Sequence, residues 1–226
     1  MQAEGIENYA RFLLRNVDMV PVNLRTVVGT LAEHRKARIK MARVQMHPAV
    51  GGLAVFEAGT FVLGVNSRHN HTRRRTTLAH EIAEVALGQL RKTTVYQLLR
   101  QRDTKREARA FRLARAILVP DWFAIPAIEV DHDNLAGTAK YIADQCRVSL
   151  DVACLRIRDF HPDFGFKLYC GNELIFSYGN FNSNDKSARQ IASFVKMGNY
   201  TLVGTRKVLP TNLWPETKTH PANPGY

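Results

Sequence analysis

Hydrophobic residues near the start of the chain change from a helical to a strand-like spacing. Apolar positions three or four residues apart predict amphipathic helices over Glu4–Asn16 and Leu24–Arg35, the second with Asn23 as its N-cap. Residues Arg38–Gln45 instead alternate between polar and apolar, which predicts a strand. The first quarter of the chain therefore predicts two helices followed by the beginning of a sheet.

Two short apolar runs follow, and they predict a β-hairpin. The runs are Gly52–Phe56 and Thr60–Val65, and the turn-forming residues Glu57-Ala58-Gly59 separate them. A polar loop over residues 66–71 then leads into a long segment with helical spacing.

Helical spacing dominates the middle of the chain. The predicted helices are Arg73–Leu90, Thr93–Arg100, a helix from near Asp103 to Pro120, Leu135–Gln145 and Leu150–Arg158. The layout of the last two resembles a helix-turn-helix, but two helices joined by a short turn are also ordinary core packing.

The C-terminal part changes character. Phe166–Tyr169 and Leu174–Tyr178 are predicted as paired strands, Ser187–Met197 as a helix and Tyr200–Val208 as a further strand. Residues Pro210–Tyr226 are rich in Pro, Thr and Asn, so we expect a loosely ordered tail. The whole pattern predicts an α+β fold: a mainly helical domain with a small sheet over residues 1–160, a small α/β module over 161–209, and the tail over 210–226.

The composition is that of a globular protein and disfavours export or membrane insertion. Residues 1–20 contain five charged side chains where a secretory signal needs an apolar core. No run approaches the roughly 20 apolar residues that a membrane helix requires. The three cysteines are odd in number and lack a CxxC spacing, so they are predicted to be free thiols. We therefore expect a cytoplasmic protein without a membrane partner.

The positive charge of the chain is concentrated in its middle. The formal net charge is +12, and residues 68–115 contain 13 Lys and Arg against 4 Asp and Glu. Such a field attracts nucleic acid, acidic protein or anionic lipid. Arg73, Arg74 and Arg75 are the candidates for binding nucleic acid or an acidic partner. A solvated arginine-rich surface explains the same charge equally well.

The segment His80-Glu81-Ile82-Ala83-Glu84 is nearly the HExxH signature of zinc peptidases, with Glu84 in place of the second histidine. Residues four apart on a helix share a face, so His80 and Glu84 can bind one ion. Two buried carboxylates without partners would cost several kcal/mol, which a divalent cation offsets. Pairing with arginines such as Arg73–Arg75 or Arg109 is the structural alternative.

A third candidate ligand, Glu107, lies on the next predicted helix. Glu107 shares a stripe with Phe111, Ala114 and Leu118, and this stripe is predicted to be buried. The alternative is that Glu107 only closes a capping box with Thr104. We favour the ligand role for Glu107. In the loop before the motif, His69 and His71 are further sources of a nitrogen ligand.

These residues together resemble the ImmA/IrrE family of zinc-dependent metallopeptidases over about Val20–Phe160. The segments that carry the resemblance are PVNLRTVV, GGLAVFEAGTFVLGVNS, RRRTTLAHEIAE and REARAFRLARAILVP. The resemblance implies a zincin-like core in which His80, Glu84 and Glu107 bind the metal and Glu81 is the catalytic base. The chain departs from the family pattern at Glu84, which replaces a histidine, and at Arg109, which replaces a small polar residue.

The resemblance also implies a substrate: a helix-turn-helix repressor whose cleavage induces stress-response or mobile-element genes. Two carboxylate ligands make a harder site that acidifies water less, so we expect weaker activity with Zn²⁺ and a larger role for Mn²⁺. The alternative is a catalytically weak or inactive peptidase-like protein that binds DNA or a repressor.

Overall fold

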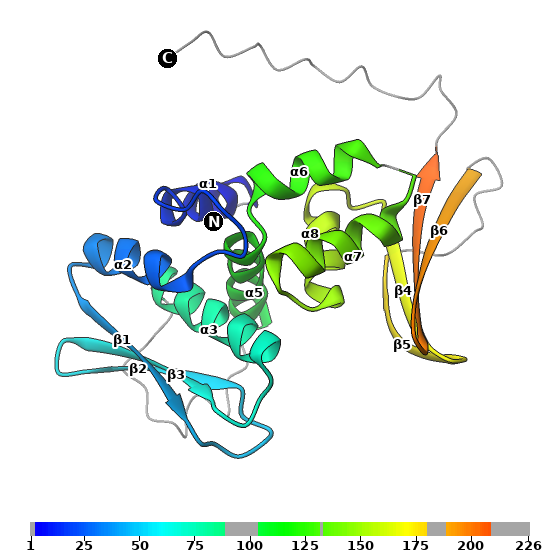
Figure 1. The fold of residues 1–226 in the computed structure, drawn as a ribbon. Coiled ribbons are helices and arrows are strands. Elements are labelled where there is room, and N and C mark those ends of the chain that lie inside the picture. The colour runs from blue at the N-terminus through cyan, green and yellow to red at the C-terminus, as the bar shows by residue number, and fades with distance from the viewer. Residues whose placement is uncertain (1–2, 89–103, 132, 180–188, 209–226) are drawn as a thin grey trace, which may run out of the picture.

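The computed structural model describes residues 3–88, 104–131, 133–179 and 189–208, and these form a mixed α+β fold with seven helices and two small sheets (Figure 1). The predicted α+β class is therefore confirmed. The helices are α1 (Ala3–Leu13), α2 (Leu24–Arg35), α3 (His71–Ala86), α5 (Thr104–Leu118), α6 (Asp121–Val130), α7 (Leu135–Cys146) and α8 (Leu150–Phe160). The strands are β1 (Arg38–Val44), β2 (Gly52–Glu57), β3 (Thr60–Asn66), β4 (Gly165–Cys170), β5 (Glu173–Tyr178), β6 (Arg189–Met197) and β7 (Tyr200–Val208).

The first sheet has three strands in the order β1-β3-β2, with β3 parallel to β1 and antiparallel to β2. The predicted hairpin between β2 and β3 is present, and its turn residues Ala58 and Gly59 both have positive φ, as tight hairpin turns require. Helix α3 packs against β2 and β3, and α2 packs against β1 and α3. This arrangement places the motif helix along one face of the sheet (Figure 1).

Helices α3 and α5 form the centre of the core, because α3 packs along α5 and α5 also contacts α1 and α8. A buried ion pair joins two of the outer helices: Arg156 on α8, only 1% exposed, donates to both carboxylate oxygens of Glu7 on α1 at 2.8 Å. Arg156 also donates to the Val119 carbonyl at 2.9 Å. The buried charge is thus fully paired, and it fixes the ends of the helical layer relative to α3 and α5.

The second sheet is antiparallel, in the order β5-β4-β7-β6, and it packs against α7 (Figure 1). The prediction of a helix over Ser187–Met197 is wrong, since residues 189–197 form β6 and pair with β7 along its whole length. From residue 192 to residue 197 exposed and half-buried positions alternate strictly, which is the strand period. Gly198, with φ of 58°, and Asn199 form the two-residue turn to β7.

Two further differences concern the middle and the end of the chain. Helix α6 was not predicted, because Pro120 ends the preceding pattern and Pro126 lies inside the new helix. The predicted helix Thr93–Arg100 and the tail Pro210–Tyr226 lie outside the described residues. Among the residues that the structure describes, no helix has the length and apolar character needed to cross a membrane.

Candidate metal centre

Helix α3 places His80 and Glu84 one turn apart, near its C-terminal end. The helix begins after Asn70, whose side chain accepts a hydrogen bond from the backbone of Arg73 at 2.8 Å. The apolar positions Ile82 and Val85 on α3 are buried. Both polar side chains are mostly covered, with 13% exposure for His80 and 13% for Glu84. Packing of the apolar face therefore holds the two polar side chains at a fixed position beside α5.

Helix α5 brings Glu107 to the same place. Its carboxylate oxygen Oε2 lies 3.4 Å from Nε2 of His80, and Glu107 remains 40% exposed. Three potential ligand atoms, one from each of His80, Glu84 and Glu107, all lie within 4.8 Å of one another. No other group of three or more His, Cys, Asp or Glu in the described residues comes close enough to hold an ion. The three predicted ligands thus meet although Glu107 is 23 residues beyond Glu84 in sequence.

The geometry fits a small divalent ion. Two donors at about 2.1 Å from a tetrahedral ion lie about 3.4 Å apart, which is the separation between His80 and Glu107. Burial lowers the pKa of His80, while Glu84 and Glu107 act in the opposite direction. Burial thus favours the neutral imidazole that binds metals.

Glu81 lies beside this group but points into the protein interior. Its side chain is buried, with 5% exposure. Burial, together with the charges of Glu84 and Glu107, raises its pKa to about 8. The carboxyl group of Glu81 is therefore suited to exchange a proton near neutral pH, which is the property of a general base.

Gly52, at the start of β2, allows Glu81 its position. A Cβ atom at Gly52 would lie 3.0 Å from Oε1 of Glu81, 2.5 Å from Thr77 and 2.6 Å from the carbonyl oxygen of Gly64. Only glycine therefore lets the edge strand approach α3 at this point. In the sequence Gly52 marks only the start of a predicted strand, although the Gly51-Gly52 pair is a signal of close backbone approach.

The contacts of two more residues at the centre, Arg106 and Phe111, differ from those that the sequence predicted. Arg106 on α5 donates to Glu84 Oε1 at 3.4 Å, whereas the sequence suggested Arg73–Arg75 or Arg109 as the arginine partners. Phe111 was expected to be buried, but it is 47% exposed and its ring lies on His80, with centroids 4.2 Å apart. The stripe of Glu107 and Phe111 thus lies at the opening of the site, and only its continuation at Ala114 and Leu118 is buried.

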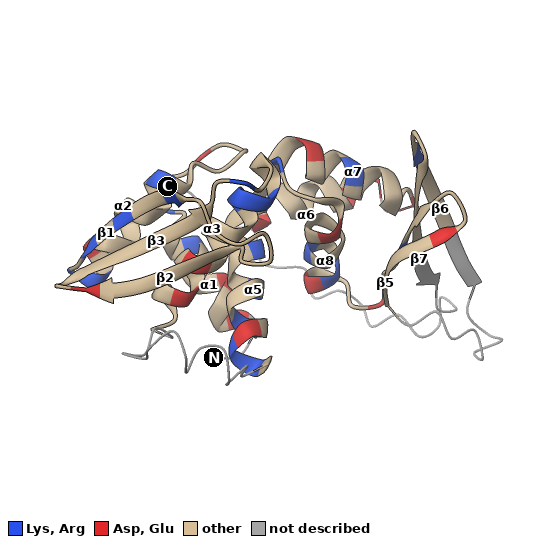
Figure 2. Cartoon of the chain, turned by 90° about the horizontal axis from the view of Figure 1, so that it is seen from below, with Lys and Arg blue, Asp and Glu red and all other residues tan. Residues whose placement is uncertain are grey.

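The other predicted residues lie elsewhere. Nε2 of His69 is 2.9 Å from the carbonyl of Pro48, and His71 lines a different cavity, so the structure brings neither to the centre. Arg74 and Arg75 line the same cavity as His71, whereas Arg73 is exposed outside it. In Figure 2 the first turns of α5 carry both acidic and basic segments, which is where Arg106 and Glu107 enter the site. The predicted basic triplet is therefore separate from the metal ligands.

A family comparison agrees with this arrangement. The model of a peptidase family, described as the IrrE N-terminal-like domain (Peptidase_M78), matches residues 35–158, which include both helices of the centre. The chain belongs to this family. The resemblance noted from the motifs is thus confirmed for the family, which is one of metallopeptidase-type hydrolases. The zincin-like peptidase core expected from the IrrE resemblance agrees with the observed fold.

A solved structure supports the fold beyond the matched segment. A Mycobacterium tuberculosis transcriptional regulator superimposes with a TM-score of 0.56 at 11% sequence identity, covering 90% of this chain and 76% of that one. At this identity the likeness concerns the fold alone. No curated protein matches the chain. The roles of individual residues therefore rest on the geometry of the site.

Proposed function

We propose that this chain is a metal-dependent endopeptidase in which His80, Glu84 and Glu107 hold one divalent ion and Glu81 is the general base. The proposal is supported by membership of the IrrE-like peptidase family and, above all, by the meeting of the three ligand side chains from α3 and α5. The proposed substrate is a helix-turn-helix transcriptional repressor, as the family resemblance implies, so that cleavage induces a stress or mobile-element response.

A divalent ion held by His80, Glu84 and Glu107, Zn²⁺ or Mn²⁺, would supply Lewis-acid chemistry at the scissile carbonyl and would lower the pKa of water. Glu81 takes a proton from the attacking water as the new C–O bond forms. The same carboxyl group then gives this proton to the amide nitrogen as the C–N bond breaks. A nearby cation favours ionised Glu81, which offsets the effect of burial on its pKa.

The identity of the ion follows from the donor atoms. One imidazole nitrogen and two carboxylates make a harder donor set than two imidazoles and one carboxylate, which raises the prospects of Mn²⁺ relative to Zn²⁺. Glu84→His restores the second nitrogen. We expect this variant to be about tenfold more active with Zn²⁺ than the native protein, since its ion keeps more positive charge. Equal rates with Zn²⁺ in both proteins would contradict the attenuation by Glu84.

The decisive test combines metal content with cleavage. A small helix-turn-helix protein encoded beside this chain would be the substrate, incubated with the native protein, Glu81→Gln and Glu129→Gln. Glu129 is an exposed glutamate on α6 and provides the matched control. We expect about one ion per native chain, and a fall in cleavage of about a thousandfold for Glu81→Gln with the ion retained. Absence of metal after reconstitution, or full activity of Glu81→Gln, would refute the proposal.

A separate observation supports a second candidate function. Glu84 already has a cationic partner in Arg106, which weakens the demand for a metal. The chain would then be a catalytically weak or inactive peptidase-like regulator that binds a repressor, or DNA through Arg73, Arg74 and Arg75. Salt-dependent DNA binding that Glu81→Gln leaves unchanged, without cleavage of any partner, would favour this function. Binding that ignores the salt concentration would exclude a phosphate-based DNA contact.

A further inference from the structure

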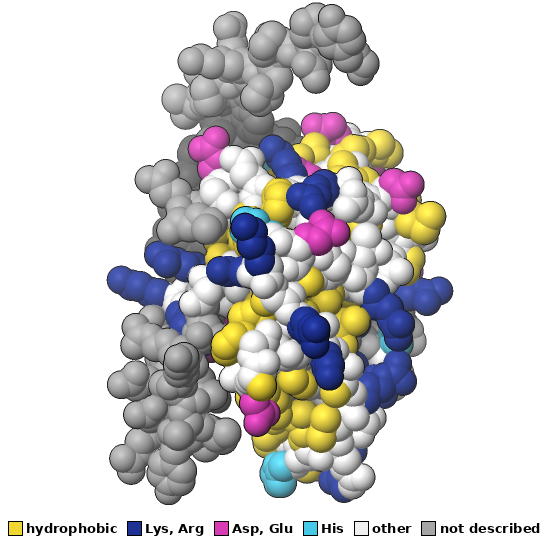
Figure 3. All heavy atoms as spheres, turned by 90° about the vertical axis from the view of Figure 1, so that its left-hand side faces the viewer, with side chains coloured by type: hydrophobic (Ala, Val, Ile, Leu, Met, Phe, Trp, Pro, Cys, Tyr) yellow, Lys and Arg dark blue, Asp and Glu magenta, His cyan; other side chains and the backbone are white. Residues whose placement is uncertain are grey.

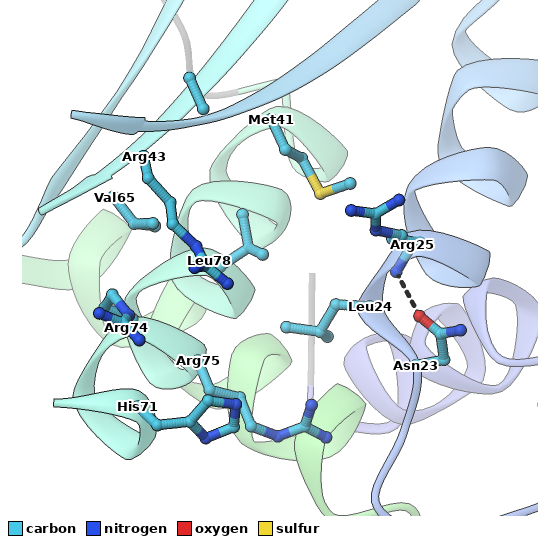
Figure 4. Close-up of a pocket in the computed structure, with 11 residues that line it drawn as sticks. Asn23, Leu24, Arg25, Met41, Arg43, Val65, His71, Arg74, Arg75 and Leu78 are labelled. Carbon is cyan, nitrogen blue, oxygen red and sulfur yellow. Dashed lines mark hydrogen bonds between the residues drawn. The ribbon is translucent and has the colours of Figure 1, made fainter. Parts of the chain in front are cut away.

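A cavity separate from the metal centre lies where the N-terminal turns of α2 and α3 meet β1 (Figure 4). Its volume is about 510 Å³. Arg25 reaches into it from α2, and Arg43 from β1 and Arg74 from α3 reach it from the opposite side (Figure 4). None of the proposed metal ligands lines this cavity, and neither does Glu81.

The lining is rich in arginine and contains no acidic side chain. In the part of the chain that the structure describes, the guanidinium groups of Arg25 and Arg43 have neither a hydrogen bond nor an ion pair. Arg74 and Arg75 donate only to backbone carbonyls, those of Ser67 at 3.1 Å and Val22 at 2.7 Å. Four positive charges therefore converge on one space without a counterion from the described residues.

The two helices add to this charge. Both α2 and α3 begin at the cavity, and the first turn of neither contains an acidic residue. The N-terminal end of a helix carries partial positive charge, which an acidic side chain or an anion normally offsets. Here arginines occupy the same turns, so an anion from outside the chain would be stabilised by both helix ends and by the side chains.

The remaining walls are apolar. Leu24, Met41 and Leu78 line the space between the arginines (Figure 4). An inorganic anion makes no use of such walls, whereas the organic part of a phosphorylated metabolite can pack on them. The volume is within the range of about 300–1,000 Å³ typical of small-molecule sites.

We propose that this cavity binds a small phosphorylated molecule of about the size of a mononucleotide. Arginine provides several N–H donors in a planar fork that matches the oxygens of a phosphate group. Arg25, Arg43 and Arg74 bind the phosphate, the N-terminal ends of α2 and α3 add their positive potential, and the apolar walls cover the organic part. This inference goes beyond peptide hydrolysis and does not depend on it.

The concave shape of the site favours a small phosphorylated ligand over a nucleic-acid strand. On the face shown in Figure 3, Lys and Arg side chains are spread among acidic and hydrophobic ones, as on an ordinary solvated surface. In the cavity the arginines line one concave space instead, which favours a ligand with a single phosphorylated end over a long backbone with regularly spaced phosphates.

The test is calorimetric titration of the full-length protein with adenosine 5′-monophosphate, inorganic phosphate and adenosine. The variant Arg25→Gln/Arg43→Gln removes two exposed cavity arginines whose guanidinium groups make no hydrogen bond or ion pair with the described residues. The matched control Arg38→Gln/Arg73→Gln removes two exposed arginines from the same strand and from helix α3, but outside the cavity. Both variants carry the same net charge.

We expect the monophosphate to bind the native protein and the control alike, and the cavity variant to bind at least about tenfold more weakly, because two charge-assisted contacts are lost. Inorganic phosphate should bind with lower affinity and should also be weakened by the cavity variant but not by the control. Adenosine should not bind. Equal weakening in both variants, equal binding of adenosine, or no binding of either phosphate compound would overturn the proposal. So would a short single-stranded DNA that binds far more tightly and is weakened equally by both variants.

Discussion

The two halves of helix α3 carry side chains of opposite charge. In its N-terminal half, Arg74 and Arg75 join arginines from α2 and β1 around a cavity without acidic side chains. In its C-terminal half, Glu81 and Glu84 join Glu107 of α5, and within the described residues Arg106 donates to Glu84 at 3.4 Å. Positive charge thus collects at one end of the helix and negative charge at the other.

This difference is informative because the helix would be more stable if the acidic and basic side chains exchanged ends. Acidic residues are stabilising at a helix N-terminus and basic residues at a C-terminus. Helix α3 has no acidic residue in its first turn and no basic residue in its last. This arrangement opposes local stability at both ends, and the two ligands proposed above, an anion at the first end and a cation at the second, would offset it.

Of the substitutions that test this difference between the two ends of α3, removal of the Glu107 carboxylate should have the largest effect. Glu107→Gln keeps the shape of the side chain but loses an anionic ligand, so we expect metal affinity to fall about a hundredfold or more. Titration with Zn²⁺ and Mn²⁺ against a competing chelator measures this change. The control Glu129→Gln should bind metal as the native protein does. Unchanged affinity in Glu107→Gln would mean that the acidic end is not a metal centre.

Glu81→Gln should stabilise the metal-free protein, and the gain should depend on pH. The pKa of Glu81 is raised from 4.5 to about 8, so the folded state binds one more proton than the unfolded state between these values. The native protein therefore loses stability as pH rises through this window, whereas the glutamine variant does not. At pH 4 we expect the native protein and the variant to have the same free energy of unfolding. At pH 8 we expect the free energy of unfolding of the variant to be higher by on the order of 2 kcal/mol.

Denaturant unfolding in the presence of a chelator measures this difference. Saturating metal should reduce it, because the cation favours the ionised form of Glu81. A constant difference at all pH values would show that burial of the charge is not its cause.

Arg106→Gln should have the smallest effect. Arg106 lies 3.4 Å from Glu84 and competes with a metal for this carboxylate. Its removal should tighten metal binding about fivefold, a change typical of one partly screened charge. The variant Arg109→Gln, on the same helix and exposed, is the control and should change metal affinity less than twofold. Weaker metal binding in Arg106→Gln would show that the arginine supports the site.

Local patterns in the sequence were enough to predict every described helix except α6 and to name the candidate ligands. His80 and Glu84 lie one turn apart in any α-helix, and the apolar stripe around Glu107 indicated which side of its helix packs inward. The hairpin of β2 and β3 likewise followed from its turn residues. The helix predicted over Ser187–Met197 failed because strand β6 is determined by pairing with β7, and its polar and apolar residues do not alternate in the sequence.

By itself, the sequence indicated the family through the resemblance of its motifs, and it indicated the α+β class and the candidate metal ligands through periodicity and spacing within each element. Only the tertiary structure decided that Arg106 contacts Glu84, that Gly52 makes room for Glu81, and that arginines from three elements share one cavity. These contacts join residues far apart in the chain. Packing of α3 against α5 and the first sheet brings them together, and no local pattern specifies that packing.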